Sequence, residues 1–212
     1  MERRHPLGQI ARLWRYPVKS LAAEPLYAVR VGASGIEGDR ARALFVKSDG
    51  HARSGREYRG KEHNLLHTVR TAERAIELAA ARHVVVAVHD GGPHFDDSAV
   101  SIVFDTWVAE LEGLAGVALD PLRFRSNLYV TAEPGFALRE ADLVGTILEC
   151  ADVAFDVLAP INRCVTPSYD IETGTSDPHV LRTIVQGRGN VLGIYCSVRR
   201  EGTLTCGDTL WR

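Results

Sequence analysis

The sequence lacks the features that mark membrane-spanning and secreted chains. No apolar run approaches the roughly 18 residues that a membrane-spanning helix requires. The first six residues are basic but lead into no apolar stretch, so no secretory signal is visible. We therefore expect a cytoplasmic protein that does not associate with membranes.

Common metal and redox motifs are also missing. The four cysteines stand at positions 150, 164, 196 and 206 and form no C-x-x-C pair, which argues against zinc ribbons and thioredoxin-type sites. Disulfides are unexpected in a cytosolic chain. The chain also has neither the G-x-S-x-G elbow of hydrolases nor a G-x-G-x-x-G turn after a strand.

The histidines form no recognisable metal site. His63 and His67 stand four residues apart, but no Glu follows His63, so the zinc motif H-E-x-x-H is absent. His89 and His94 flank a Gly-Gly-Pro turn without a nearby pair of acidic ligands. We interpret all four as ordinary surface or half-buried imidazoles.

The chain has no excess of positive charge. It contains 25 Lys and Arg against 27 Asp and Glu, a formal net charge of -2. This balance argues against the broad cationic surface that binds nucleic acid. An anionic ligand must therefore be held by a few local Arg, Lys and backbone N–H groups.

The sequence does contain the elements of a soluble globular fold rich in β-structure. Its 212 residues are 45% hydrophobic and suffice for one large domain or two small ones. Alternating apolar residues and turn signals predict strands at 9–14, 26–31, 41–46, 83–89, 127–131, 145–150 and 153–158. A hairpin of 193–199 with 203–206 is expected to close the chain.

Helices and loops complete this prediction. Residues 71–82, with Thr71 as N-cap, and residues 105–114 have helical patterns. A turn at 48–50, a polar exposed loop at 51–64 and a flexible glycine-rich loop at 187–190 are expected. The break at 90–93 favours a boundary near residue 95. The predicted class is mainly β with some α (α+β).

Cys164 is the strongest candidate for a reactive residue. It follows Arg163 directly and precedes a turn beginning at Pro167. Because neighbouring cations stabilise a thiolate, this position suits a nucleophile or a metal ligand. The alternative is a buried cysteine that only packs. Packing is the favoured interpretation for Cys150 and Cys196, which lie in apolar strands, and Cys206 favours neither.

Three short segments are candidates for binding an anion. Residues 123–127 (Arg-Phe-Arg-Ser-Asn) combine guanidinium groups, which grip phosphate bidentately, with an amide. Residues 16–20 (Tyr-Pro-Val-Lys-Ser) and 35–40 (Gly-Ile-Glu-Gly-Asp-Arg) place cations in tight turns. Neither fits the Walker spacing. Each segment, taken alone, is also compatible with a solvated charged loop.

Together and in order, these motifs resemble the MOSC family (molybdenum cofactor sulfurase C-terminal domain), including members similar to the mitochondrial amidoxime-reducing component. Residues 123–127 resemble its R-F-R-P-N signature. Residues 163–167, 170–174 and 181–182 resemble the segment with its cysteine. Residues 202–208 (Gly-Thr-Leu-Thr-Cys-Gly-Asp) resemble its closing motif. The matches are collinear from about residue 9 to 210.

The resemblance implies a MOSC β-barrel with flanking helices over 96–212, an N-terminal β-barrel-like region over 1–95, and a molybdenum–molybdopterin cofactor. Cys164 would be the catalytic residue and the thiolate ligand of molybdenum, for which soft ligands are suited. The implied cofactor-binding residues are Lys19, Ser20, Arg40, Arg125, Asn127, Asn162 and Arg163.

The implied activity is reduction of an N-hydroxylated or N-oxygenated small-molecule substrate, with electrons from a separate electron-transfer protein. Two alternatives remain open. Cys164 would carry a persulfide in a sulfurtransferase, or the same pocket would bind the cofactor without turnover.

Overall fold

The computed structural model describes residues 4–47 and 54–212. The turn predicted at 48–50 and the start of the loop predicted at 51–64 lie outside these ranges.

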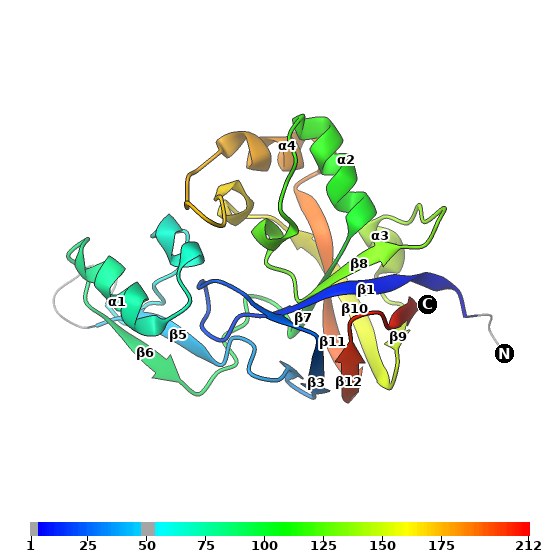
Figure 1. Ribbon diagram of the computed structural model, residues 1–212, viewed down its shortest axis with the longest axis horizontal. Helices are drawn as coiled ribbons and strands as arrows, with labels where there is room; N and C mark the ends of the chain where they lie inside the picture. The colour runs from blue at the N-terminus through cyan, green and yellow to red at the C-terminus, as the bar shows by residue number, and fades with distance from the viewer. Residues whose placement is uncertain (1–3, 48–53) are drawn as a thin grey trace.

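A closed barrel of seven strands forms the larger part of the molecule (Figure 1). The sheet runs in the order β13-β9-β10-β11-β7-β8-β1, and β13 pairs again with β1 to close it. Closure leaves these strands without an open edge. The structure thus confirms the mainly β, α+β prediction. The strands are β1 (Pro6–Arg15), β7 (Val100–Phe104), β8 (Leu128–Ala132), β9 (Ile147–Cys150), β10 (Val153–Asn162), β11 (Val191–Arg200) and β13 (Thr209–Trp211).

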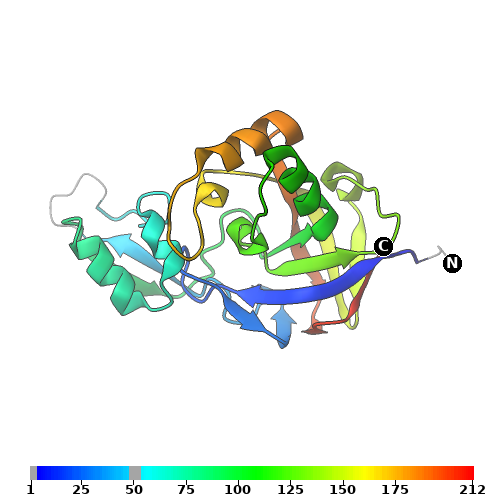
Figure 2. The ribbon, with the colours of Figure 1, turned by 45° about the horizontal axis from the view of Figure 1, so that its top comes forward.

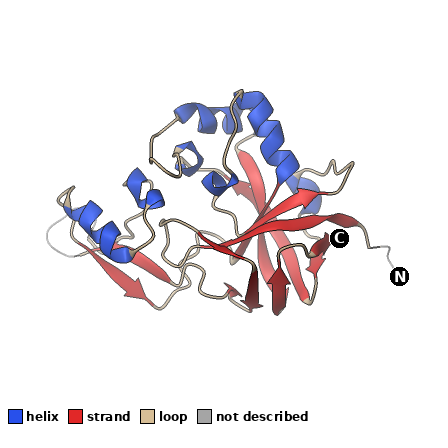
Figure 3. Ribbon diagram, in the orientation of Figure 1, coloured by secondary structure: helices blue, strands red, loops and turns tan. Residues whose placement is uncertain are grey.

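One neighbouring pair in the barrel, β7 and β8, is parallel, whereas its other pairs are antiparallel. Parallel neighbours need a crossover connection, and here helix α2 (Asp105–Ala115) and the 3₁₀ turn η2 (Pro121–Phe124) provide it. Helices α2 and α4 (Pro178–Arg188) pack together on one side of the barrel (Figures 2 and 3). The short helix α3 (Glu140–Leu143) lies beside β10 and β11.

A smaller unit extends from the barrel (Figure 1, left). Strands β5 (Arg42–Val46) and β6 (Val86–Asp90) form a two-stranded sheet with α1 (Ala72–Ala80) and the 3₁₀ turn η1 (Asn64–Thr68) beside it. Thr71 caps α1, as predicted, by accepting a hydrogen bond from the N–H of Arg74. The unit has its own core, which includes Leu44, Leu66 and Ala75.

The remaining strands join the N-terminal region to the barrel. β2 (Glu24–Leu26) pairs with β1. β3 (Ala28–Gly32) lies between β4 (Gly35–Ile36) and β12 (Gly202–Thr205). The division near residue 95 stays a prediction, while hydrogen bonding places β1 in the same barrel as the strands that follow that residue.

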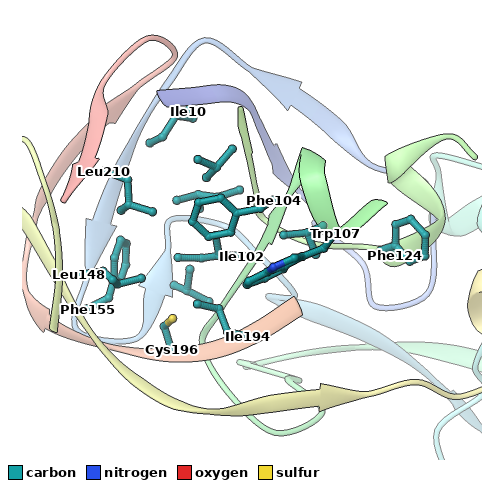
Figure 4. Close-up of a cluster of buried hydrophobic side chains, with 14 of the residues drawn as sticks. Ile10, Ile102, Phe104, Trp107, Phe124, Leu148, Phe155, Ile194, Cys196 and Leu210 are labelled. Carbon is teal, nitrogen blue, oxygen red and sulfur yellow. The ribbon is translucent and has the colours of Figure 1, made fainter. Parts of the chain in front are cut away.

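Apolar side chains from all around the barrel meet inside it (Figure 4). All five residues of β7 are buried, because this strand is covered on both faces. Phe104, at its end, stacks on Phe136 with ring centroids 4.4 Å apart and meets Trp107 edge-on at 4.8 Å. Cys150 and Cys196 are part of this core, which confirms that they pack.

The predicted closing hairpin is wrong, because β12 pairs with β3 instead of folding back on β11. Leu204 of β12 is completely buried and joins Val29 and Val31 of β3 in the core. Because these three side chains are buried together, β12 lies against β3 and does not form a hairpin with β11.

Three further expectations need correction. The strand predicted over 26–31 is interrupted at Tyr27, which is 75% exposed. The described part of the loop predicted at 51–64 is not uniformly exposed, since Tyr58 and His63 are buried. Residues 187–190 are not a loose loop: Arg188 ends α4 with a buried side chain, and Gly189 adopts the left-handed conformation typical of a helix C-terminus.

In the ranges 4–47 and 54–212, each helix is too short or too polar to traverse a bilayer.

We predict that Phe104→Ala lowers the free energy of unfolding by about 3–5 kcal/mol, because it removes a buried ring and leaves a cavity in the barrel. Tyr27→Ala, at an exposed position, should change it by less than about 0.5 kcal/mol. Denaturant unfolding of both variants measures this. Equal effects would contradict the assignment of Phe104 to the core.

Candidate cofactor-binding site

Loops from the barrel and from the smaller unit enclose a cavity of about 260 Å³. Its walls come from segments far apart in the sequence: the end of β1, the start of β5, η1, the β6–β7 loop, η2, and the end of β10. Of the eight residues predicted to form the site, seven line this cavity: Lys19, Ser20, Arg40, Arg125, Asn162, Arg163 and Cys164.

Cys164 lies where β10 leaves the barrel, and its side chain is exposed. Its thiol donates a hydrogen bond to the Thr166 hydroxyl at 3.2 Å. Cys150 and Cys196 differ from it, because burial raises the pKa of Cys150 to about 12 and raises that of Cys196 as well. Among the cysteines, Cys164 therefore offers the accessible sulfur at the cavity.

Arg125 is fixed by contacts on several sides. Its backbone is left-handed (φ 52°) at the end of η2, and its guanidinium lies 4.2 Å from the centre of the Tyr16 ring. Nη1 donates to Nδ1 of His67 at 3.2 Å. Nη2 is buried and has no hydrogen-bond partner among the residues that the structure describes. Burial lowers the pKa of Arg125 to about 10, which leaves it cationic at neutral pH.

Arg40 also contacts the Tyr16 ring and supports Arg125. Its backbone is also left-handed (φ 48°), and its guanidinium lies 4.8 Å from the centre of the Tyr16 ring. It pairs with Asp39 and donates from Nη2 to the Arg125 carbonyl at 3.1 Å. Burial opposes the charge of Arg40, but Asp39, together with Tyr16 and Asp96, outweighs this and raises the pKa of Arg40. Non-glycine residues in this region of φ are strained, and such residues cluster at functional sites.

Arg163, directly after β10, also lines the cavity. Nε donates to the Leu192 carbonyl and Nη1 to the Phe124 carbonyl, both at 2.7 Å. Within the described chain, Nη2 is buried without a partner. Burial lowers the pKa of Arg163 to about 10. Two buried, charged guanidinium groups thus each retain an unsatisfied N–H, which is costly unless an acceptor binds.

Lys19 is already paired. Its Nζ lies 3.0 Å from a Glu57 carboxylate oxygen and 2.9 Å from one of Asp96. Burial opposes the charge of Asp96, but Lys19 overcomes this and lowers the pKa of Asp96. Glu57 and Asp96 carry no recognisable signal in the sequence, and the pairing follows from the fold.

The structure does not bring Asn127 to the cavity. Its side chain is buried, accepting from the N–H and hydroxyl of Ser101 at 3.1 and 3.0 Å and donating to the Trp14 carbonyl at 3.3 Å. It ties β7 and β8 to β1 behind the site. Arg123 of the same motif pairs with Asp170, which connects η2 to the loop after Cys164.

His67 was interpreted as an ordinary histidine, but it lines the cavity. Its ring lies so close to Gly60 that a Cβ there would stand 2.0 Å from Nε2. Burial, with the charge of Arg125, lowers the pKa of His67 to about 3, so the ring is neutral and accepts from Arg125. The sequence signal for this role was weak, because the contact joins residues 58 positions apart.

The cavity is cationic although the chain as a whole is slightly acidic. Seven of its lining residues are Lys or Arg and two are Asp, against a net charge of -2 for the sequence. A partly enclosed cavity lined with one sign of charge attracts ligands of the other sign.

The fold and site therefore define a closed β-barrel protein with an anion-attracting cavity beside an exposed thiol. Residues 87–211 match the family model of the MOSC domain, and because this is more than half of the chain, the protein belongs to the MOSC domain family. The MOSC domain is associated with binding of the molybdenum cofactor. No curated protein sequence matches the chain.

A solved structure shares the fold at low identity. The YUAD protein from Bacillus subtilis is 17% identical, with a TM-score of 0.61 over 100% of this chain and 97% of its own. YiiM from Escherichia coli is 15% identical with a TM-score of 0.46, over 98% of this chain and 68% of its own. The first similarity shows a common fold alone, and the second is too weak to support an argument.

We predict that iodoacetamide modifies Cys164 in the folded protein well before Cys150 and Cys196, which should react only on unfolding, because the thiolate must be accessible to react. Peptide mass spectrometry measures the order of labelling. Labelling of Cys150 or Cys196 at the rate of Cys164 would show that the buried positions are assigned wrongly.

We also predict an acid sensitivity that depends on His67. The unfolded chain takes up a proton at His67 near pH 6.5, whereas the folded protein keeps it neutral to about pH 3. Stability therefore falls as pH decreases through this window, by up to about 1.4 kcal/mol per pH unit. Urea unfolding between about pH 4 and 6 should show a shallower dependence for His67→Asn than for the wild type.

The control is His83→Asn, at an exposed position with a left-handed backbone that Asn tolerates (φ 57°). Its pH dependence should equal that of the wild type. An unchanged slope for His67→Asn would disprove the assignment of a buried neutral imidazole.

Proposed function

We propose that the cavity binds a molybdenum–molybdopterin cofactor and that Cys164 supplies the protein thiolate to the metal. The observation that carries this proposal is the pair of buried guanidinium nitrogens, Arg125 Nη2 and Arg163 Nη2, that lack partners in the described parts of the chain. Both arginines line the same cavity as the exposed Cys164 thiol.

The donor set fits the chemistry of this cofactor. A phosphate group accepts charge-assisted hydrogen bonds, which are strongest from guanidinium groups. Satisfying a buried N–H that is otherwise orphaned recovers about 1–3 kcal/mol. A thiolate is the soft ligand that molybdenum would take from the protein.

The residues around these donors prepare the site. Arg40 and His67 hold Arg125 in place by its carbonyl and its Nη1. The Thr166 hydroxyl, which accepts from the Cys164 thiol, would rotate and donate to the thiolate form that binds a metal.

A second hollow, of about 320 Å³, offers room for a substrate. It shares His67, Arg123, Arg125 and Thr166 with the cavity and is also lined by Tyr169 and Ile171. This mixed lining suits a small molecule with an apolar part and a polar group.

We further propose an oxidoreductase activity on N-hydroxylated or N-oxygenated small molecules. When bound, the cofactor would supply two-electron redox chemistry at the metal, as such a reduction needs. A separate electron-transfer protein and a cytoplasmic location are parts of this proposal.

We predict that protein made in a host that synthesises molybdopterin contains about one molybdenum per chain, given one thiolate ligand per site. Cys164→Ser should lose most of it, because a hydroxyl is a harder and weaker ligand. Cys206→Ser, a cysteine substitution outside the cavity lining, should retain it. Elemental analysis of the purified proteins measures this.

Full molybdenum in Cys164→Ser, or none in the wild type, would refute the proposal. A gain of one sulfur on Cys164 after treatment with a cysteine desulfurase, without molybdenum, would support the sulfur carrier. Tight pterin binding without reduction, even with strong artificial electron donors, would support a non-catalytic module.

A further inference from the structure

We infer that Glu140 is a positioning residue for Arg163 and acts through the peptide group between Leu192 and Gly193. Arg163 contributes one of the two unsatisfied N–H groups of the cavity, so the functional meaning of this inference rests on the proposed function. Arg163 lines the cavity, whereas Glu140, Leu192 and Gly193 are not among the residues that line it.

A single peptide unit connects the two side chains. The Leu192 carbonyl accepts from Arg163 Nε at 2.7 Å, and the Gly193 N–H donates to Glu140 Oε1 at 3.2 Å. Because a peptide group is planar and trans, its carbonyl and its N–H point in opposite directions. The guanidinium therefore lies on one side of this peptide and the carboxylate on the other.

Through this peptide, the charge of the Glu140 carboxylate affects the hydrogen bond that holds Arg163. A carboxylate that accepts from an N–H polarises the peptide and makes its carbonyl oxygen a stronger acceptor. The Leu192 carbonyl should then hold Arg163 Nε more firmly than an ordinary carbonyl does. In a cavity lined by cations, this bond helps to keep Arg163 close to its neighbours in spite of their repulsion.

Packing leaves the guanidinium little freedom. Gly193 has a φ of +91°, and a Cβ on it would stand 2.9 Å from Arg163 Nη2 and 2.8 Å from Val103 Cγ2. Arg163 therefore lies directly against the backbone of β11, and rotation of the Leu192–Gly193 peptide would displace it. Only glycine permits this close approach in this conformation.

Glu140 is itself held in position. It is buried, and its Oε1 also accepts from Arg188 Nη2 at 2.7 Å. Arg188, whose side chain is 2% exposed, also pairs with Glu110. The carboxylate is thus compensated by a buried cation, as a charge in such a place requires.

The alternative is that Glu140 serves only to neutralise Arg188. Glu110 separates the two possibilities. It pairs with Arg188, but the hydrogen bonds of the described chain include none between Glu110 and the Leu192–Gly193 peptide. Glu110→Gln is therefore the matched control for Glu140→Gln. Both remove one carboxylate from Arg188 and keep the size of the side chain.

The first measurement is the NMR signal of Arg163 Nε–Hε, assigned with Arg163→Lys. In Glu140→Gln we expect the proton to shift upfield and its exchange with solvent to accelerate about 3-fold to 10-fold, as for a weakened hydrogen bond. Glu110→Gln should leave both unchanged. Glu140→Asp, which keeps the charge but shortens the side chain, should change them in the same direction as Glu140→Gln.

The second measurement is titration with inorganic phosphate, followed by calorimetry. Glu140→Gln should weaken binding about 3-fold to 10-fold, and Glu110→Gln less than about 2-fold. The inference would be overturned if the Arg163 Nε–Hε signal were the same in Glu140→Gln and Glu110→Gln. It would also be overturned if neither Glu140→Gln nor Glu140→Asp changed that signal. The expected Arg163 shift without phosphate binding by the wild type supports the inference and counts against the proposed anion site.

Discussion

The pairing of β13 with β1 is the constraint on which the rest of the structure depends. It joins residues from the two ends of the chain, with Gly8 opposite Leu210 and Gln9 opposite Thr209. On its other side β1 lies close to β8, since a Cβ on Gly8 would stand 2.2 Å from the Thr131 carbonyl. Closure removes the sheet edge and encloses the apolar core. The cavity is built from loops that leave the strands of this barrel and from the smaller unit.

Lys and Arg side chains gather at the cavity, and carboxylates neutralise only some of them. Arg163 is held by two backbone carbonyls, and Arg125 by a ring face and a neutral histidine. These partners fix the guanidinium groups without cancelling their charge. Carboxylates are used where balance is needed, at Lys19 and Arg40. In the described chain, Nη2 of Arg125 and Nη2 of Arg163 are left without an acceptor.

Much of the fold followed from local patterns. The strand of β1, the helices α1 and α2 and the packing of Cys150 and Cys196 were predicted correctly, because apolar periodicity and capping are local properties. The hairpin of β11 with β12 was not, because the burial of Leu204 against Val29 is decided by residues far apart in the chain. β7 and α4 were missed. β7 is buried at all five positions and therefore shows no alternation. α4 does carry local signals, namely Asp177 as N-cap, Pro178 in its first turn and a buried stripe that includes Val180 and Ile184.

The sequence by itself determined the residue types and the order of the motifs: a cysteine beside an arginine, and short cationic turns whose collinearity indicated the MOSC family. Only the tertiary structure decided which of these side chains share a cavity. It brought seven of the eight predicted residues together, placed Asn127 behind the site and added His67. The reason is physical, since charge, burial and free hydrogen-bonding capacity belong to contacts between distant segments, and closure of the barrel creates those contacts.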